Sequence, residues 1–201
     1  MTDFADFEGV LAEWFGAEGS PNDKPAGHAR WFGGGAEFDE RLRSLFGDLP
    51  ERAQRGELDV WAASARGALA LTLVLDQLPR NLFRGTPKSF AFDARAREVA
   101  RAALAAGFDT QVDPVWRAFF YLPFEHSESL ADQEIAVDRM RAAAEGAKGA
   151  AREMLEDYTD YALRHLRIVE RFGRFPHRNA ILARESTREE VAFLKEPGSS
   201  F

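Results

Sequence analysis

The stretch Ala68-Leu69-Ala70-Leu71-Thr72-Leu73-Val74-Leu75 decides the fold, because eight consecutive residues contain one polar side chain. It belongs to a segment with helical spacing, residues 58–78, which is expected to stop at Pro79. A helix that is apolar on every side has no face to present to water, and it is therefore buried at the centre of its domain. The sequence thus predicts a central helix that is surrounded by others.

Apolar residues recur at spacings of three and four over most of the remaining chain. Further helices are predicted for residues 4–15, 37–54, 90–106, 113–122, 129–144, 150–172 and 186–194. The one that opens at Asp113-Pro114 is expected to be interrupted by Pro123, and residues 21–35 are expected to form a loop carrying His28, Trp31 and Phe32. Short connections favour antiparallel neighbours. The predicted fold is all-α, with eight or nine helices stacked as antiparallel helical hairpins.

The composition limits the classes of protein to which the chain can belong. The chain has 201 residues, 45% of them hydrophobic, which is enough for one domain over residues 1–201 with a flexible tail at 196–201. The absence of cysteine excludes a disulfide scaffold and a thiol nucleophile. The net charge of −7 argues against binding to nucleic acid or anionic membranes. Neither a signal peptide nor an apolar run of membrane-spanning length is visible, so a cytoplasmic location is expected.

Polar residues of the kind that bind ligands follow the apolar stretch directly. They are Asp76, Gln77, Arg80, Asn81 and Arg84. In the functional interpretation the two arginines hold an anion and the other three side chains orient it. In the structural interpretation the arginines cap the last carbonyls of the helix and Asp76 neutralises them. The segment taken alone favours the structural interpretation.

A second cluster, Glu125-His126-Ser127-Glu128, stands just before a predicted helix. A carboxylate beside an imidazole can fix its tautomer and raise its basicity, so these residues could perform acid–base chemistry. The same residues also suit a plain helix N-terminus, with Ser127 as the cap and Glu128 favoured by the helix dipole. The spacing does not decide between the two.

A third candidate, His165, lies in the middle of an inward stripe on the helix predicted for residues 150–172. The stripe consists of Met154, Tyr158, Tyr161, His165, Ile168 and Phe172. A buried imidazole needs hydrogen-bond partners for both nitrogens. We therefore expect a polar neighbour inside the bundle, either His126 or a tyrosine hydroxyl.

The fourth candidate is the loop that contains Arg174, His177, Arg178 and Asn179, after Gly173 has ended the helix in the left-handed conformation. From residue 164 to residue 184 there are six arginines and one glutamate, on a chain that is acidic overall. This asymmetry suits an anion site, although arginines paired with surface acids would give the same count.

A metal site is a further possibility. His126, His165 and His177 with Glu125 or Glu128 could supply nitrogen and oxygen ligands for it. No H-E-x-x-H or E-x-x-H pair occurs, and no two histidines share a helix face. The glycines at residues 33–35 follow no predicted strand, so a nucleotide loop is not indicated either. We expect neither a metal nor a cofactor.

Several long motifs together resemble a known family. They are LDQLPRNLFRGTP at residues 75–87, AFD at 91–93, YLPFEHSE at 121–128 and FGRFPHRN at 172–179, with Trp14-Phe15, Trp31-Phe32 and Ser186-Thr187 in the expected order. This pattern is similar to the bacterial "domain of unknown function 924" family over nearly the whole chain. The resemblance implies a helical fold like tetratricopeptide hairpin stacks, and it implies no established reaction or cofactor. Ala183 stands where the family pattern leads us to expect glycine.

The working hypothesis is that these clusters converge on one cationic pocket for a small anionic ligand. Three alternatives stay open. One is a tetratricopeptide-like scaffold that binds a peptide carboxylate. Another is an enzyme with His126 or His177 as the proton carrier and Glu125 or Glu128 orienting it. The last is a set of purely structural networks. A homodimer is compatible with each of them.

Overall fold

The apolar stretch 68–75 forms the middle of α5 (Ala65–Leu82) in the computed structural model, which describes residues 7–16, 31 and 35–200. All eight side chains of the stretch are buried. Within the described chain, α5 packs against the α-helices α1 (Phe7–Phe15), α3 (Ala36–Phe46), α4 (Leu49–Gln54), α6 (Asp93–Ala105) and α7 (Ala118–Glu125). The prediction of a central helix is therefore confirmed.

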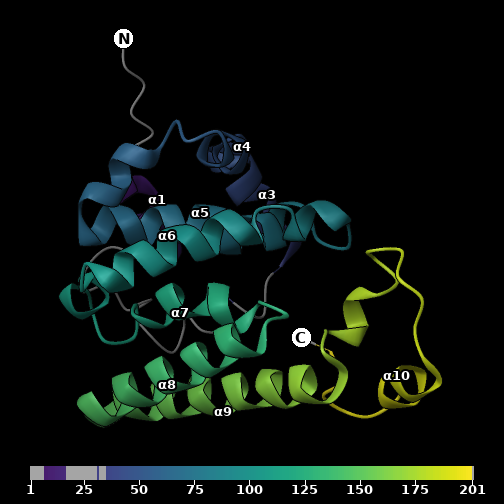
Figure 1. Ribbon diagram of the computed structural model, residues 1–201. Coiled ribbons are helices and arrows are strands. Elements are labelled where there is room, and N and C mark those ends of the chain that lie inside the picture. Colours follow the sequence, from purple (N-terminus) through teal and green to yellow (C-terminus); the bar gives the residue numbers. More distant parts are fainter. Residues whose placement is uncertain (1–6, 17–30, 32–34, 201) are drawn as a thin grey trace.

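The second half of the chain adds a layer beneath this group. Helices α8 (Leu130–Gly146) and α9 (Gly149–Phe172) pack along each other, and α7 lies between them and the α5–α6 layer (Figure 1). The C-terminal segment, residues 173–200, carries α10 (Arg188–Phe193) and flanks both layers. Short 3-10 helices complete the described chain: η1 (Asp59–Ala63), η2 (Pro87–Phe90), η3 (Phe108–Gln111) and η4 (Pro176–Arg178).

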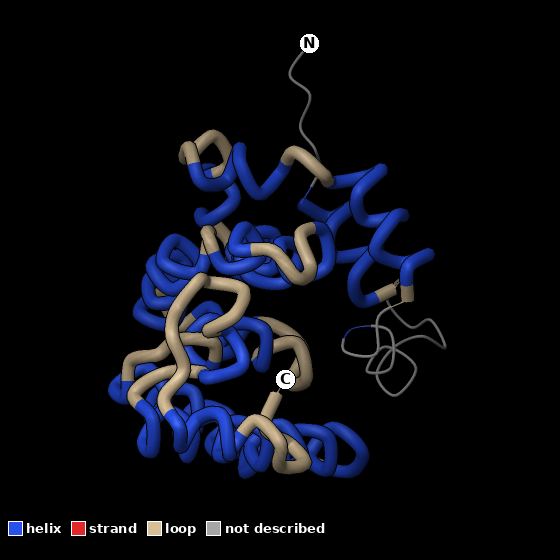
Figure 2. The backbone as a smooth tube through the Cα atoms, turned by 90° about the vertical axis from the view of Figure 1, so that its right-hand side faces the viewer, coloured by secondary structure: helices blue, strands red, loops and turns tan. Residues whose placement is uncertain are grey.

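The all-α class is confirmed, because the described part of the chain holds helices, turns and loops and no strand (Figure 2). Contacts between α5 and α6, α6 and α7, α7 and α8, and α8 and α9 are those of successive helical hairpins. The tetratricopeptide-like superhelical arrangement is compatible with these contacts and stays a prediction.

Two prolines that were expected to end helices lie inside them instead. Pro79 is within α5, which continues to Leu82, and Pro123 is within α7, which continues to Glu125. A proline removes one backbone hydrogen bond. In both cases a large apolar side chain beyond the proline, Leu82 or Phe124, is buried in the core. This burial favours continuation of the helix over a break.

Other predicted boundaries also shift. The segment 37–54 divides into α3 and α4 at residues 47–48, and the segment 58–78 divides into η1 and α5 at Ser64, whose hydroxyl accepts a hydrogen bond from the amide of Gly67. Helix α7 begins at Ala118 rather than at residue 113. The segments 129–144 and 150–172 correspond to α8 and α9. His28 and Phe32, and residues 4–6 of the first predicted helix, lie outside the described residues.

The C-terminal segment follows the expected local rules. Gly173 ends α9 with φ of 67°, and Thr187 and Glu190 form a capping box at the start of α10. Ala183, at the position where glycine was expected, adopts φ of 53°, which is the left-handed conformation that glycine tolerates best. Ser199, in the expected tail, is buried and donates a hydrogen bond to the carbonyl of Leu194.

Candidate functional site

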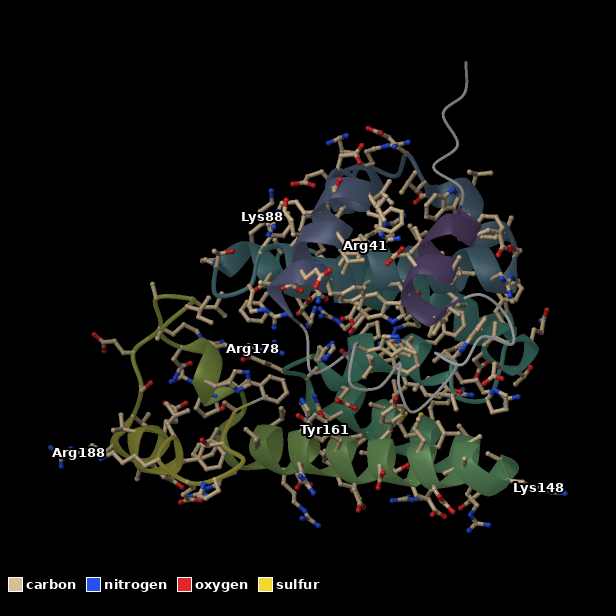
Figure 3. All side chains as sticks on the ribbon, turned by 180° about the vertical axis from the view of Figure 1, so that it is seen from behind. Arg41, Lys88, Lys148, Tyr161, Arg178 and Arg188 are labelled. Atoms are coloured by element: carbon tan, nitrogen blue, oxygen red, sulfur yellow. The ribbon has the colours of Figure 1, made fainter. Side chains whose placement is uncertain are left out.

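A cavity of about 730 Å³ opens between α5, α7, α9 and the C-terminal segment. This volume lies within the range of small-molecule sites in proteins. Figure 3 shows Arg178 reaching from the C-terminal segment toward the body of the molecule, with Tyr161 below it on α9. The ionisable residues of the cavity lining are Arg80, Arg84, Glu125, His126, Asp157, Tyr158, Asp160, Tyr161, Arg164, His165, His177 and Arg178.

Helical spacing explains why residues from different motifs meet here. Helix α5 lines the cavity with residues 77, 80 and 81, the turn after it adds residue 84, and α7 with its C-cap lines the cavity with residues 118, 122, 125 and 126. Positions three and four apart share one face of a helix. The polar clusters after the apolar stretch and before α8 are thus brought to the same hollow. His165 and the loop residues His177 and Arg178 complete it.

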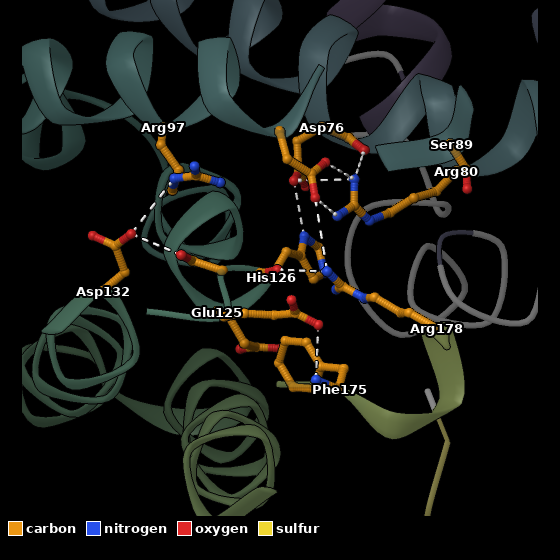
Figure 4. A network of polar contacts seen from close by, with 12 residues as sticks. Asp76, Arg80, Ser89, Arg97, Glu125, His126, Asp132, Phe175 and Arg178 are labelled. Atoms are coloured by element: carbon orange, nitrogen blue, oxygen red, sulfur yellow. Dashed lines mark hydrogen bonds and ion pairs between the residues drawn. The ribbon is translucent and has the colours of Figure 1, made fainter. Parts of the chain in front are cut away.

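Asp76 lies behind the cavity lining and contacts three residues of that lining, Gln77, Arg80 and His126 (Figure 4). Its side chain is buried and lies 2.8 Å from Nδ1 of His126, and its other oxygen accepts a hydrogen bond of 2.6 Å from Nε2 of Gln77. Arg80 donates to the backbone carbonyl of Asp76 and, through both terminal nitrogens, to the carboxylate of Asp93 at 3.0 and 3.1 Å. Burial alone would raise the pKa of Asp76, but Arg80, His126 and the hydrogen bonds hold it well below its ordinary value.

The tautomer of His126 follows from this partner. An ionised carboxylate only accepts hydrogen bonds, so Nδ1 of His126 carries the proton and Nε2 is left with its lone pair. Burial and the nearby charge of Arg80 lower the pKa of His126, against the opposing effect of Asp76. The imidazole is therefore a neutral, oriented base on the cavity wall.

Glu125 differs from Asp76 in its protonation state. Burial, reinforced by the charge of Asp76, raises the pKa of Glu125 to about 8, so its carboxyl group is mostly neutral at pH 7. One of its oxygens lies 3.4 Å from Nδ1 of His165, which is also 3.0 Å from the carbonyl oxygen of Tyr161. The polar groups at Nδ1 of His165 are therefore Glu125 and a backbone carbonyl, whereas the sequence predicts His126 or a tyrosine hydroxyl as its neighbour. The ring of His126 is 6.4 Å away between centroids.

Arg178 carries a positive charge that is buried at the cavity wall. Its side chain is only 8% exposed, and its guanidinium lies between the rings of Phe90 and Phe175, at 4.7 and 4.4 Å. It donates one hydrogen bond, from Nη1 to the carbonyl oxygen of His126 at 2.9 Å. Within the described chain, Asp93 supplies the one carboxylate oxygen within 4 Å, at 3.9 Å, and Nε of Arg178 has no hydrogen-bond partner. Burial and Arg80 lower the pKa of Arg178 to about 10, so it remains a cation.

The remaining predicted site residues make contacts outside this cluster. Arg174 pairs with Glu190 at 2.6 Å, and Glu128 pairs with Arg184 at 2.7 Å. Arg174, Glu128 and Asn179 are absent from the cavity lining, and Asn179 donates a hydrogen bond to Ser186. Asn81 and Arg84 do line the cavity, and both contact the carboxylate of Asp39.

Sequence reasoning missed residues that complete the site. Asp93 accepts hydrogen bonds from Arg80, and Phe90 packs on Arg178. From the sequence, both residues were assigned only to the helix predicted for residues 90–106, and Asp93 also to a family motif. Tyr158 and Tyr161 line the cavity, and their place on the inward stripe of α9 was the signal that could have found them. No local pattern pairs Phe90 with a residue 88 positions away in the chain.

The described residues contain no group of three or more histidine, aspartate or glutamate side chains that could hold a metal ion. None of their helices is both long and apolar enough to cross a membrane.

Comparisons with known proteins agree with one another. The family model described as "Bacterial protein of unknown function (DUF924)" matches residues 10–198. The chain is also similar to a solved structure, the protein of unknown function ATU0120 from Agrobacterium tumefaciens, with 41% sequence identity and a TM-score of 0.80. That match covers 94% of this chain and 96% of the other. The comparison with curated proteins gives no match.

Proposed function

The chain belongs to the DUF924 family of bacterial proteins of unknown function, and from that premise we propose that its cavity binds a small anion bearing a carboxylate or phosphate group. The observation that carries the proposal is Arg178. A buried guanidinium is ordinarily paired with a carboxylate, because an unpaired buried charge is costly. Arg178 is buried with no carboxylate at hydrogen-bond distance in the described chain.

Two other arginines of the cavity lining are paired with protein acids. Arg80 contacts Asp76 and Asp93, Arg84 contacts Asp39, and the neutral carboxyl of Glu125 adds no negative charge at pH 7. Arg164 also lines the cavity, but it is exposed and lies against the ring of Tyr161. Within the described chain, the nearest carboxylate to the buried Arg178 is that of Asp93, which lies 3.9 Å away and also pairs with Arg80. A ligand anion would accept the hydrogen bonds of Arg178 that no carboxylate of the described chain accepts, and donors of a guanidinium fit carboxylate and phosphate oxygens. The cavity volume favours a small molecule over a folded peptide.

The test measures binding of benzoate and of inorganic phosphate by ligand-observed NMR and calorimetry. Arg178→Gln is expected to weaken binding roughly tenfold to a hundredfold, because it removes one charge-assisted interaction. Arg174→Gln is the matched control, since Arg174 lies in the same segment and pairs with Glu190 outside the cavity. Wild-type affinity in a folded Arg178→Gln variant, or absence of binding to the wild type, contradicts the proposal.

A second candidate, an acid–base enzyme, is supported by the pair of Asp76 and His126. Nε2 of His126 would accept a proton from a bound substrate, and Asp76 would stabilise the resulting imidazolium. The neutral carboxyl of Glu125 on the same wall would supply a proton. His126 is favoured over His177 because a buried carboxylate orients it.

This candidate is tested by screening small carboxylated and phosphorylated metabolites for turnover. His126→Gln is expected to lower kcat about 100-fold to 10,000-fold, the usual contribution of a general base. His177→Gln is the matched control and is expected to retain most of the activity. Equal rates in the wild type and His126→Gln, or no turnover by the wild type, would end the enzyme hypothesis and leave anion binding standing.

A further inference from the structure

The cavity has two chemically different ends. The face of α7 that lines it begins with Ala118 and Leu122 and ends with Glu125 and His126. Trp31, which also lines the cavity, packs edge-on against Phe119 at the beginning of the same helix. One end of the hollow is thus apolar and aromatic. The other holds the imidazoles and Arg178, since Arg178 contacts the backbone of His126.

Helix α9 shows a parallel gradient of charge along the opposite wall. Asp157 and Asp160 come first, both exposed, and Arg164 and His165 follow one to two turns later. His165 lies beside Glu125, so the basic part of α9 meets the ionisable part of α7. The acidic part of α9 repels a second negative charge on any ligand that extends away from Arg178.

We propose that the natural ligand is a monocarboxylic acid with an apolar body, whose carboxylate binds Arg178 and whose body lies along α7 toward Trp31. This inference rests on the proposed anion-binding function and adds the class of ligand to it. Among the described residues, Arg178 is the one buried guanidinium of the lining with no carboxylate at hydrogen-bond distance, so its donors are available to one anionic group. A phosphate monoester carries nearly two charges at neutral pH, and Asp157 and Asp160 on the wall formed by α9 disfavour the second charge.

The dimensions of the cavity set the size of the body. Ala118 and His126 are eight residues apart, which is about 12 Å along a helix axis. That length and the volume of about 730 Å³ suit a medium-chain or aryl-substituted acid rather than acetate. Each methylene group that is transferred from water to an apolar wall strengthens binding about fourfold, the equivalent of about 0.8 kcal/mol.

The experiment compares acetate, butyrate, hexanoate and octanoate, with inorganic phosphate and octanol as head-group probes, by calorimetry on the full chain. Affinity is expected to rise about fourfold for each methylene over the first members of the series, and octanoate is expected to bind more tightly than phosphate or octanol. Leu122→Ala should flatten the dependence on chain length. Leu130→Ala, on an exposed residue outside the lining, is the matched control and should leave it unchanged.

The outcomes separate this inference from the function on which it rests. Binding of acetate and phosphate that depends on Arg178, without any gain from chain length, would overturn the monocarboxylate and leave anion binding in place. Tight binding of octanoate that persists in Arg178→Gln would overturn both, because the body would then bind without its head group. Failure of every anion to bind the wild type would also remove both. Because the chain-length series is measured on the wild type, the result does not depend on whether Leu122→Ala folds.

Discussion

Replacing Asp76 with alanine is expected to lower the free energy of unfolding by about 3–5 kcal/mol, the usual cost of removing one partner from a buried ionic network. The side chain of Asp76 is fully buried and contacts His126, Gln77 and Arg80. Without it, the Nδ1 proton of His126 and the amide of Gln77 lose their acceptor, and Arg80 keeps the carboxylate of Asp93 and the backbone carbonyl of residue 76. Urea denaturation followed by circular dichroism measures the change.

Glu156→Ala is the matched control for this loss. Glu156 pairs with Arg152 on the surface of α9, with both side chains more than half exposed, and such pairs contribute about 0–1 kcal/mol. In a His126→Ala background, Asp76→Ala should cost less than in the wild type, because the two side chains interact directly. A loss below about 1 kcal/mol, or strict additivity of the two substitutions, would show that the network does not stabilise the fold.

Glu125→Gln is expected to change how stability depends on pH. The folded pKa of Glu125 is about 8, well above the ordinary value of 4.5, so the folded chain holds a proton that the unfolded chain has lost. The stability supplied by this group is fully present below pH 4.5 and is lost as the pH rises through 8. Between pH 6 and 8 the wild type should therefore lose about 2 kcal/mol relative to Glu125→Gln, which has no carboxyl group to titrate.

The measurement is a set of urea denaturation curves at several pH values for the two proteins. The shared histidines contribute equally to both profiles, so the difference between them isolates Glu125. Glu153→Gln, on the exposed surface of α9, is expected to follow the wild type at every pH. Parallel profiles for the wild type and Glu125→Gln would mean that Glu125 is ionised in the folded protein at neutral pH.

The fold was predictable where a local pattern determines it. The stretch 68–75 is apolar on all sides and occupies the centre, and Gly173 ends α9 in the left-handed conformation as expected. The errors came at Pro79 and Pro123, where a local rule predicts a break. Burial of the side chains that follow depends on helices elsewhere in the chain, which a local rule does not include.

Residues of the candidate site could be predicted from the sequence, whereas the contacts between them could not. Arg80 and His126 were identified from the sequence as members of polar clusters beside predicted helices, and both line the cavity. Which arginine forms an ion pair with a carboxylate depends on residues that are distant in the sequence. Arg174 meets Glu190, whereas Arg178 meets two phenyl rings and a carbonyl group. These two arginines lie four residues apart in the same loop, and only the tertiary structure distinguishes them.

The position of Arg178 makes one wall of the cavity dependent on the C-terminal segment. Its guanidinium reaches the helical body from a segment that carries one six-residue α-helix and follows the left-handed turn at Gly173. Detachment of that segment alone, while α5 to α9 stay folded, would remove one wall of the hollow. Amide protons of residues 177–184 should then exchange with solvent through this partial opening. An anion that bridges Arg178 to the helices would slow their exchange without changing that of α5.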